Sequence, residues 1–146
     1  MPKLFDKILC PVDFDPNSIA ALDFALRLAE EHDGTIYVLN VIPTPKAPAT
    51  TDPYPVLSEG LKDQLETFAQ EHLKGKVPFQ ALVRTGDPAQ MILTVANELQ
   101  IDAIVMATHG YKGVQRLVIG TVAERVVREA EQPVITIRPR AAAQAV

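Results

Sequence analysis

The sequence predicts an α/β fold, an open sheet of five mainly parallel strands with helices on both faces. Short, continuous apolar runs alternate with longer segments whose apolar residues recur at helical spacing. Continuous apolar runs are typical of strands buried on both faces. The length of 146 residues suits one domain, and no linker or internal repeat divides the chain. We expect a single domain over 1–146, with 141–146 as a loose tail.

Two strands and a helix are predicted in the first third of the chain. KILCPV (7–12) and TIYVLNVI (35–42) are apolar runs, and 17–31 between them has helical spacing. Gly34 lies just past that helix, where a left-handed residue is common. Five prolines within 43–55 exclude regular structure there. This segment is either a surface loop or a flap over a ligand site.

The middle of the chain adds two helices and a strand. Residues 59–73 carry an amphipathic stripe, and VPFQALVRT (77–85) is typical of a strand. Asp87 is placed as a helix N-cap, with Pro88 at the first helical position. The third helix then continues through Leu99. We interpret Asp87 as structural.

Two more strands complete the alternation. DAIVMA (102–107) and PVITIRP (133–139) are the fourth and fifth strands, with a helix over 121–131 between them. Its inward side is expected to carry Val122, Val126 and Val127. Five parallel strands are commonly ordered 2-1-3-4-5, and 3-2-1-4-5 is a related order. Periodicity alone does not choose between these two.

Composition and charge exclude several functions. The net charge is −4, so the chain has no basic footprint for nucleic acid and no polybasic membrane patch. No apolar run approaches the roughly 18 residues of a membrane span, and the N-terminus lacks signal-peptide features. Cys10 is the only cysteine, which excludes an intramolecular disulfide and a cysteine-built metal site. We expect a cytoplasmic protein.

Two strand ends indicate a ligand site. Ligands of open α/β sheets bind beyond the carboxyl ends of the strands, where the winding reverses. In the 3-2-1-4-5 order this point lies between the first and fourth strands. Asp13 follows the first strand, and the fourth leads into ATHGYKGVQRLVIGT (107–121). Both features would then face one crevice.

The glycine-rich stretch has the chemistry of an anion site. Gly110 and Gly113 can adopt positive φ and direct N–H groups inward. Gly120 and Thr121 open a helix whose free N–H groups favour a phosphate. Asp13 is an acceptor for ribose hydroxyls, or for a magnesium ion that bridges phosphates.

Structural interpretations of these residues stay open. The stretch can be an ordinary turn, and Thr121 can simply cap its helix. Asp13 can cap the first helix, a role for which Asp15, Asn17 and Ser18 compete. For three side chains of the stretch, a solvated loop position competes with a functional one: His109, Lys112 and Arg116. No P-loop, G-x-G-x-x-G, G-x-S-x-G or two-histidine zinc motif is present.

With these features the chain resembles the universal stress proteins. The nucleotide motif of that family is G-x2-G-x9-G-[ST]. Gly110 and Gly120-Thr121 match it, and Ala107 occupies the place of its first glycine. KILCPVDF, GDPA, GTVAERVV and PVITIRP are also typical of the family, so the resemblance covers essentially the whole chain.

The resemblance implies a Rossmann-like sheet in the 3-2-1-4-5 order that binds an adenine nucleotide in the crevice. The adenosine side would be lined by residues after the first strand, adenine would bind the backbone of Val41, and the glycine-rich stretch would hold phosphates. The residues expected to contact the ligand are Pro11, Val12, Asp13, Val41, Met106, Ala107, His109, Gly110, Lys112, Gly113, Gly120, Thr121 and Val122. Asp13 is also the candidate ligand of a magnesium ion.

Ala107 bears on whether nucleotide binding is retained. Members of the family that do not bind ATP have usually lost motif glycines. Alanine disfavours positive φ, but it fits without strain if residue 107 still belongs to the fourth strand. We expect retained binding.

The family is commonly dimeric through its fifth strand. In the 3-2-1-4-5 order this strand is a sheet edge, and an apolar edge strand invites pairing. We expect a homodimer through Val134, Ile135, Thr136 and Ile137, without nucleic-acid or membrane partners.

The main hypothesis is a cytoplasmic stress-response switch that binds ATP, with or without Mg²⁺. It would not be an enzyme, and any hydrolysis would be slow and secondary. One alternative is a slow ATPase or phosphotransferase. The other is a nucleotide-free dimeric interaction protein in which the glycine-rich stretch is only structure.

Overall fold

The computed structural model describes residues 3–44, 55–108 and 120–138. One parallel sheet runs through them in the order β3-β2-β1-β4-β5. The strands are β1 (Lys7–Pro11), β2 (Thr35–Ile42), β3 (Phe79–Thr85), β4 (Ala103–Ala107) and β5 (Val134–Ile137). The helices are α1 (Pro16–His32), α2 (Pro55–Leu73), α3 (Pro88–Glu98) and α4 (Thr121–Glu129). The predicted fold class and the 3-2-1-4-5 order are confirmed.

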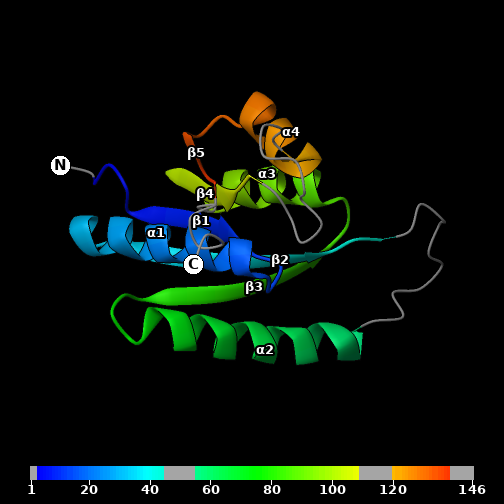
Figure 1. Cartoon of the computed structure of the whole chain (residues 1–146). Helices are drawn as coiled ribbons and strands as arrows, with labels where there is room; N and C mark the ends of the chain where they lie inside the picture. Colours follow the sequence, from blue (N-terminus) through cyan, green and yellow to red (C-terminus); the bar gives the residue numbers. More distant parts are fainter. Residues whose placement is uncertain (1–2, 45–54, 109–119, 139–146) are drawn as a thin grey trace, which may run out of the picture.

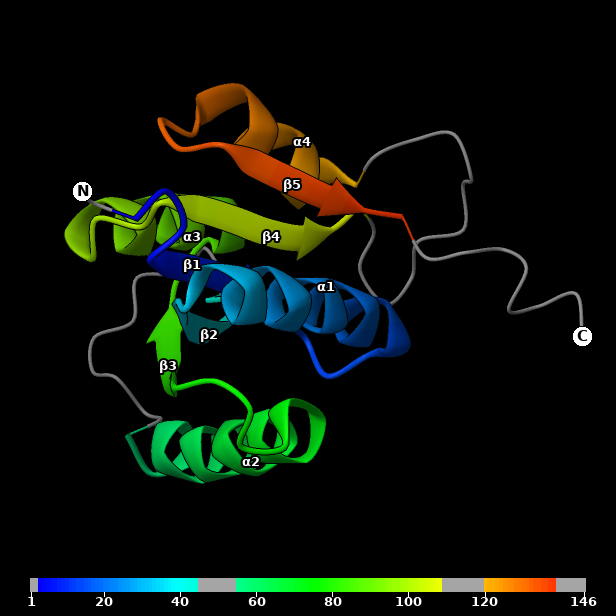
Figure 2. The same cartoon turned by 90° about the vertical axis from the view of Figure 1, so that its left-hand side faces the viewer.

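Helices cover both faces of the sheet (Figure 1 and Figure 2). α1 and α2 pack on one face with Cys10, Val38 and Val105, while α3 and α4 pack on the other with Leu9 and Ile104. Adjacent strand residues therefore enter opposite cores, because side chains alternate along a strand. This double burial explains the continuous apolar runs of the central strands. Among the described helices, none is long and apolar enough to cross a membrane.

Two helices begin as capping chemistry requires. Asp87 accepts a hydrogen bond from the N–H of Gln90 at 2.9 Å, and Pro88 follows it, as predicted. At α1, Asp15 is the N-cap, and its Oδ1 accepts from the N–H of Ser18 at 2.8 Å. Asp15 thus takes the capping role for which four polar residues competed in the sequence.

Two predictions are wrong in their detail. The left-handed residue after α1 is Asp33 (φ 55°), not Gly34. Gly34 serves close packing instead, because a Cβ there would lie 2.5 Å from the carbonyl oxygen of Phe5. Val127 is 48% exposed, whereas its neighbour Val126 is fully buried. The apolar stripe by which α4 contacts the core is therefore narrower than predicted, because it does not include Val127.

Several element boundaries also differ from the predicted ones. α2 begins at Pro55 rather than at 59, since proline is well suited to the first helical position. β3 begins at Phe79 rather than at 77, because Pro78 has no N–H for the sheet. α4 ends at Glu129 rather than at 131. Most of the predicted loop or flap, 45–54, and the predicted tail lie outside the described residues.

Candidate functional site

The carboxyl edge of the sheet has a step between β1 and β2. β1 pairs with β2 as far as Pro11 and Leu39, and the N–H of Val12 then donates to the carbonyl of Leu39 at 2.8 Å. β2 continues beside β3 to Ile42. A pocket of about 820 Å³ opens at this step. Its size is typical of small-molecule sites.

The structure brings most of the predicted site residues together around this pocket. The ones that line it are Pro11, Val12, Asp13, Val41, Met106, Ala107, Gly120, Thr121 and Val122. They come from the ends of β1, β2 and β4 and from the start of α4. Four predicted residues, His109, Gly110, Lys112 and Gly113, lie outside the described residues, as does Arg116.

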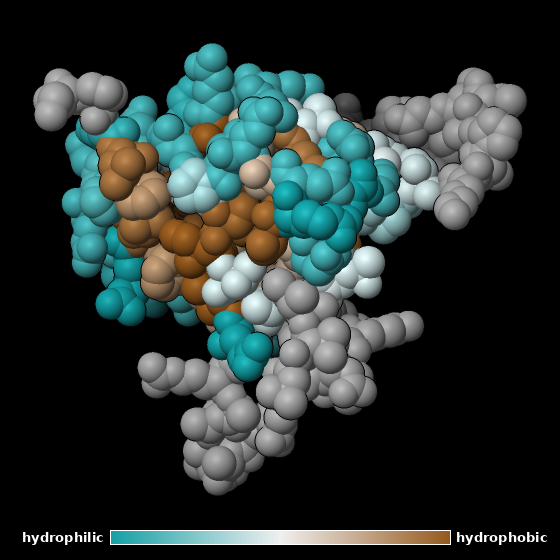
Figure 3. Space-filling model, turned by 90° about the horizontal axis from the view of Figure 1, so that it is seen from above, coloured by the Kyte–Doolittle hydropathy of each residue, from teal (hydrophilic) through white to brown (hydrophobic). Residues whose placement is uncertain are grey.

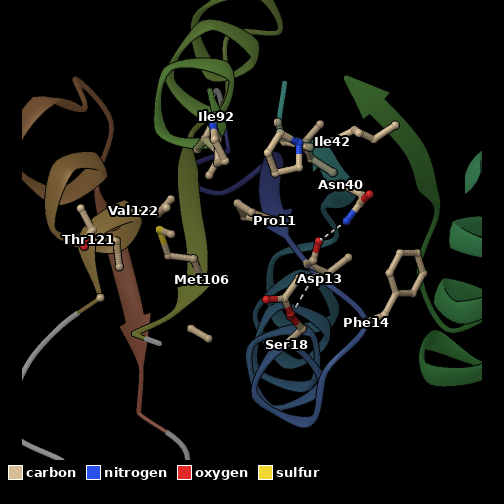
Figure 4. Close-up of a pocket in the computed structure, with 18 of the residues that line it drawn as sticks. Pro11, Asp13, Phe14, Ser18, Asn40, Ile42, Ile92, Met106, Thr121 and Val122 are labelled. Carbon is tan, nitrogen blue, oxygen red and sulfur yellow. Dashed lines mark hydrogen bonds between the residues drawn. The ribbon is translucent and has the colours of Figure 1, made fainter. Parts of the chain in front are cut away.

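Sequence reasoning missed part of the lining. Phe14, Asn40, Ile42, Leu61 and Ile92 also border the pocket. Figure 4 shows Asn40, Ile42 and Phe14 on the side of the pocket opposite Thr121 and Val122. Isoleucine and leucine at such positions carry no sequence signal that separates a pocket from a core. Asn40 was detectable as a polar residue within an apolar strand.

The backbone of Val41 points toward the crevice. Along a strand, backbone groups alternate between the two neighbouring strands. Leu39 directs its carbonyl to β1, and Ile42 directs its carbonyl to Gly86 on the opposite side. Val41, two residues after Leu39, therefore faces the β1 side beyond the point where pairing with β1 stops. This geometry suits backbone hydrogen bonds to a planar ligand.

Asp13 is held at the pocket by α1 without capping it. Its Oδ1 accepts from Ser18 Oγ at 2.6 Å, and its own N–H donates to Ser18 Oγ at 2.9 Å (Figure 4). Asp15 is buried, with only 4% of the residue exposed. Burial, and next a hydrogen bond with Asp13, raise the pKa of Asp15. The two carboxyl groups therefore interact at the start of α1.

The N-terminus of α4 lies at the opposite wall of the pocket. Gly120 is its N-cap, and as a glycine it provides no side-chain hydrogen bond to the first turn. Thr121 is exposed and is the first helical residue, which excludes the alternative that it caps the helix. The first amides of a helix lack internal acceptors and favour anions. Because Thr121 and Val122 line the pocket, these amides border it.

The ends of the glycine-rich segment meet beside the crevice. The N–H of Gly120 donates to the carbonyl of Thr108 at 2.6 Å. Ala107 just before it belongs to β4 and pairs with Ile137. Alanine thus fits an extended backbone where the family motif has glycine.

A side-chain network joins the start of α3 to the middle and end of α4. Asp87 Oδ2, which caps α3, also binds Arg125 of α4 at 2.8 Å. A second nitrogen of Arg125 donates to Gln90 at 3.1 Å, and its Nε binds Glu129 at 2.9 Å. Hydrogen bonding to Glu129 is the main cause of the raised pKa of Arg125. The network ties together two walls of the pocket.

A metal ion in this pocket would need further oxygen atoms, supplied by a bound small molecule. Within the described part of the chain, no group of three or more His, Cys, Asp or Glu residues is arranged to hold an ion. Asp13 offers one carboxylate at the pocket. Magnesium often binds through one carboxylate, substrate phosphates and water. Asp13 therefore fits an ion that arrives with a phosphorylated ligand.

Comparison with known proteins identifies the family. The model of the Universal stress protein family matches residues 4–138. Universal stress protein MJ0531 of Methanocaldococcus jannaschii is 32% identical, over 92% of this chain and 83% of the relative. Among solved structures, a universal stress protein in complex with cAMP has a TM-score of 0.70 at 16% identity, covering 92% of this chain and 97% of its own.

A second structure is similar in fold. The universal stress protein from Archaeoglobus fulgidus in complex with dAMP has a TM-score of 0.67 at 22% identity, covering 91% of this chain and 97% of its own. The family match extends over nearly the whole sequence, from before β1 to just after β5. The chain belongs to the universal stress protein family.

Proposed function

We propose that the chain binds ATP in the crevice and acts as a nucleotide-dependent regulatory switch in the cytoplasm. One observation carries the proposal: an apolar slot at the step between β1 and β2 that ends at the uncapped N-terminus of α4. A nucleotide has the matching polarity, with a planar base at one end and anionic phosphates at the other. The cAMP and dAMP complexes of two structural neighbours support this class of ligand.

The proposed pose follows from the walls of the pocket. Phosphates would bind at Thr121 and Val122, where the helix amides and dipole favour negative charge. The ribose would lie near Asp13, and the base near the backbone of Val41. Mg²⁺, if bound, would join Asp13 to the phosphates.

Binding without rapid turnover is the second part of the proposal. Hydrolysis needs a base that activates water. Among the described lining residues, Asp13 is the only acid or base, and its Oδ1 already accepts from Ser18. A switch instead requires a partner that distinguishes the bound state from the free state. Phosphate release from ATP is expected to stay far slower than ATP dissociation, and rapid release would favour the ATPase alternative.

Thr121→Glu tests the binding site. A glutamate in the first turn favours the helix, so the melting temperature should not fall. The same charge would repel phosphates, and calorimetry should show ATP binding weakened by about tenfold or more. Gln70→Glu is the control, because it adds the same negative charge at an exposed position of α2 away from the pocket. This variant should bind ATP normally. Absence of ATP binding by the wild-type protein would refute the proposal.

A homodimer through β5 is also proposed. β5 lies at the edge of the sheet, and its four residues remain only half-buried. The face of the molecule that carries β5 shows an apolar area within a hydrophilic rim (Figure 3). Pairing of two edge strands would cover this surface.

Thr136→Pro tests this pairing. Ile137 directs its carbonyl to Thr108, after β4, so the alternating Thr136 directs its N–H away from the sheet. Proline at such an edge position removes an outward donor and keeps the bonds to β4. We expect a folded monomer in analytical ultracentrifugation where the wild type is a dimer. A wild-type monomer, or an unchanged dimer in the variant, would exclude pairing through β5.

A further inference from the structure

Phe14 has an unusual backbone conformation beside the pocket. Its φ is +67°, in the left-handed region that bulky residues rarely adopt. Such strain persists only where the surrounding structure imposes it, and it concentrates at functional sites. The residues on both sides explain how the conformation is imposed.

Hydrogen bonds to α1 fix both neighbours of Phe14. The N–H of Asp13 donates to Ser18 Oγ at 2.9 Å, and Oδ1 of Asp15 accepts from the N–H of Ser18 at 2.8 Å. The N–H of Asp15 also approaches Oδ1 of Asp13 at 3.4 Å. The turn between them needs a left-handed residue, and glycine or asparagine would supply it with less strain. The backbone therefore does not explain why the residue is phenylalanine.

The ring of Phe14 lies between the pocket and α2. It is 37% exposed and lines the pocket together with Asn40 and Leu61. The Phe14 ring and the Phe68 ring of α2 form a T-shaped pair, with centroids 5.4 Å apart and an interplanar angle of 71°. This contact holds the ring in place, yet leaves part of it open.

The pocket consequently has two chemically different ends. Thr121 and the start of α4 form an end suited to an anion. Figure 4 shows Phe14 and Ile42 on the other side, beyond Asp13. A ligand with its phosphates at α4 extends its base away from them, toward this apolar and aromatic end.

We propose that Phe14 is a ligand-contacting residue that closes the base end of the pocket, and that its strained backbone is retained for this contact. The inference rests on the proposed nucleotide binding and adds which side chain recognises the base. An aromatic ring offers a planar base a stacking or edge contact. The ligand class is therefore nucleosides and nucleotides, rather than sugar phosphates or polyphosphates.

Calorimetry with adenosine and with ATP tests the contact in Phe14→Gly. Loss of an aromatic contact to the base should weaken both ligands by the same factor, about tenfold. Gln100→Gly is the matched control, because Gln100 also has a left-handed backbone (φ 54°) but does not line the pocket. It should bind both ligands normally. Affinities of Phe14→Gly within about twofold of the wild type would overturn the inference while leaving the proposed function intact.

A measurement on the wild-type protein covers the case in which Phe14→Gly does not fold. Nuclear Overhauser effects between the Phe14 ring and the base protons of bound ATP should be present in protein with labelled phenylalanines. Their absence in a saturated complex would overturn the inference. If the wild type binds neither adenosine nor ATP, the proposed function fails first, and this inference fails with it.

Discussion

The N-termini of α3 and α4 border the same pocket but are completed differently. α3 is capped by the side chain of Asp87, and Pro88 at its start has no N–H to satisfy. α4 starts from Gly120, which has no side chain to cap its first turn. Arg125, in the middle of α4, connects this helix to the α3 cap Asp87. Within the part of the chain that the structure describes, a side-chain cap therefore completes α3, whereas the capping residue of α4 provides none.

Removal of the α3 cap should give the largest loss of stability. Asp87→Ala deletes both the bond to the N–H of Gln90 and the ion pair with Arg125. A lost cap and an exposed ion pair together cost about 1–2 kcal/mol in the free energy of unfolding. Urea denaturation measures this loss.

Asp87→Asn separates the two contributions. Asparagine caps a helix as well as aspartate does but lacks the charge for Arg125. We expect it to lose only about 0.5 kcal/mol. Equal losses in the two variants would mean that the cap contributes nothing, and α3 and α4 would then not differ as described.

The second capped start, that of α1, gives a smaller and pH-dependent effect. Burial and the neighbouring Asp13 raise the pKa of Asp15 above its ordinary 3.8, so the folded state holds this proton more readily than the unfolded state. The contribution of Asp15 to the free energy of unfolding therefore falls as the pH rises through the raised pKa. Asp15→Asn keeps the cap without an ionisable group and should raise the free energy of unfolding at neutral pH. The gain should shrink toward about pH 4, and a pH-independent gain would contradict the assignment.

Adding a cap to α4 should have the smallest effect on stability. Gly120 has an extended backbone (φ −64°) that serine can adopt. Gly120→Ser should stabilise the free protein by about 0.3 kcal/mol, because serine caps slightly better than glycine. Its hydroxyl would occupy an amide that we assign to the phosphates, so ATP affinity should fall severalfold. Stability and affinity that rise together would show that the ligand does not use these amides.

Most of the fold could be predicted from local patterns. Apolar runs located all five strands, and the Asp87-Pro88 pair located the start of α3. The order of the strands was not fixed by these patterns, because both candidate orders bury the same runs. The error at Gly34 has a similar origin: its lack of a side chain matters through Phe5, which is distant in sequence.

The site was predictable where a backbone motif defines it and not where packing does. Gly120 and Asp13 were expected at the pocket and line it. The choice of Asp15 as the α1 cap depends on the three-dimensional course of the turn, since several neighbouring residues have capping side chains. Nothing in the local sequence indicates that Phe14 is left-handed, because aromatic residues rarely are.

The burial of Cys10 has a practical consequence for experiments. Cys10 is fully buried within β1, and burial raises the pKa of its thiol to about 12. A thiol that is neutral and inaccessible reacts slowly with alkylating reagents. A cysteine introduced on the surface near the pocket would then be the one site that a maleimide dye labels in the folded protein. Site-specific labelling for fluorescence studies of ligand binding would therefore not require Cys10 to be replaced first.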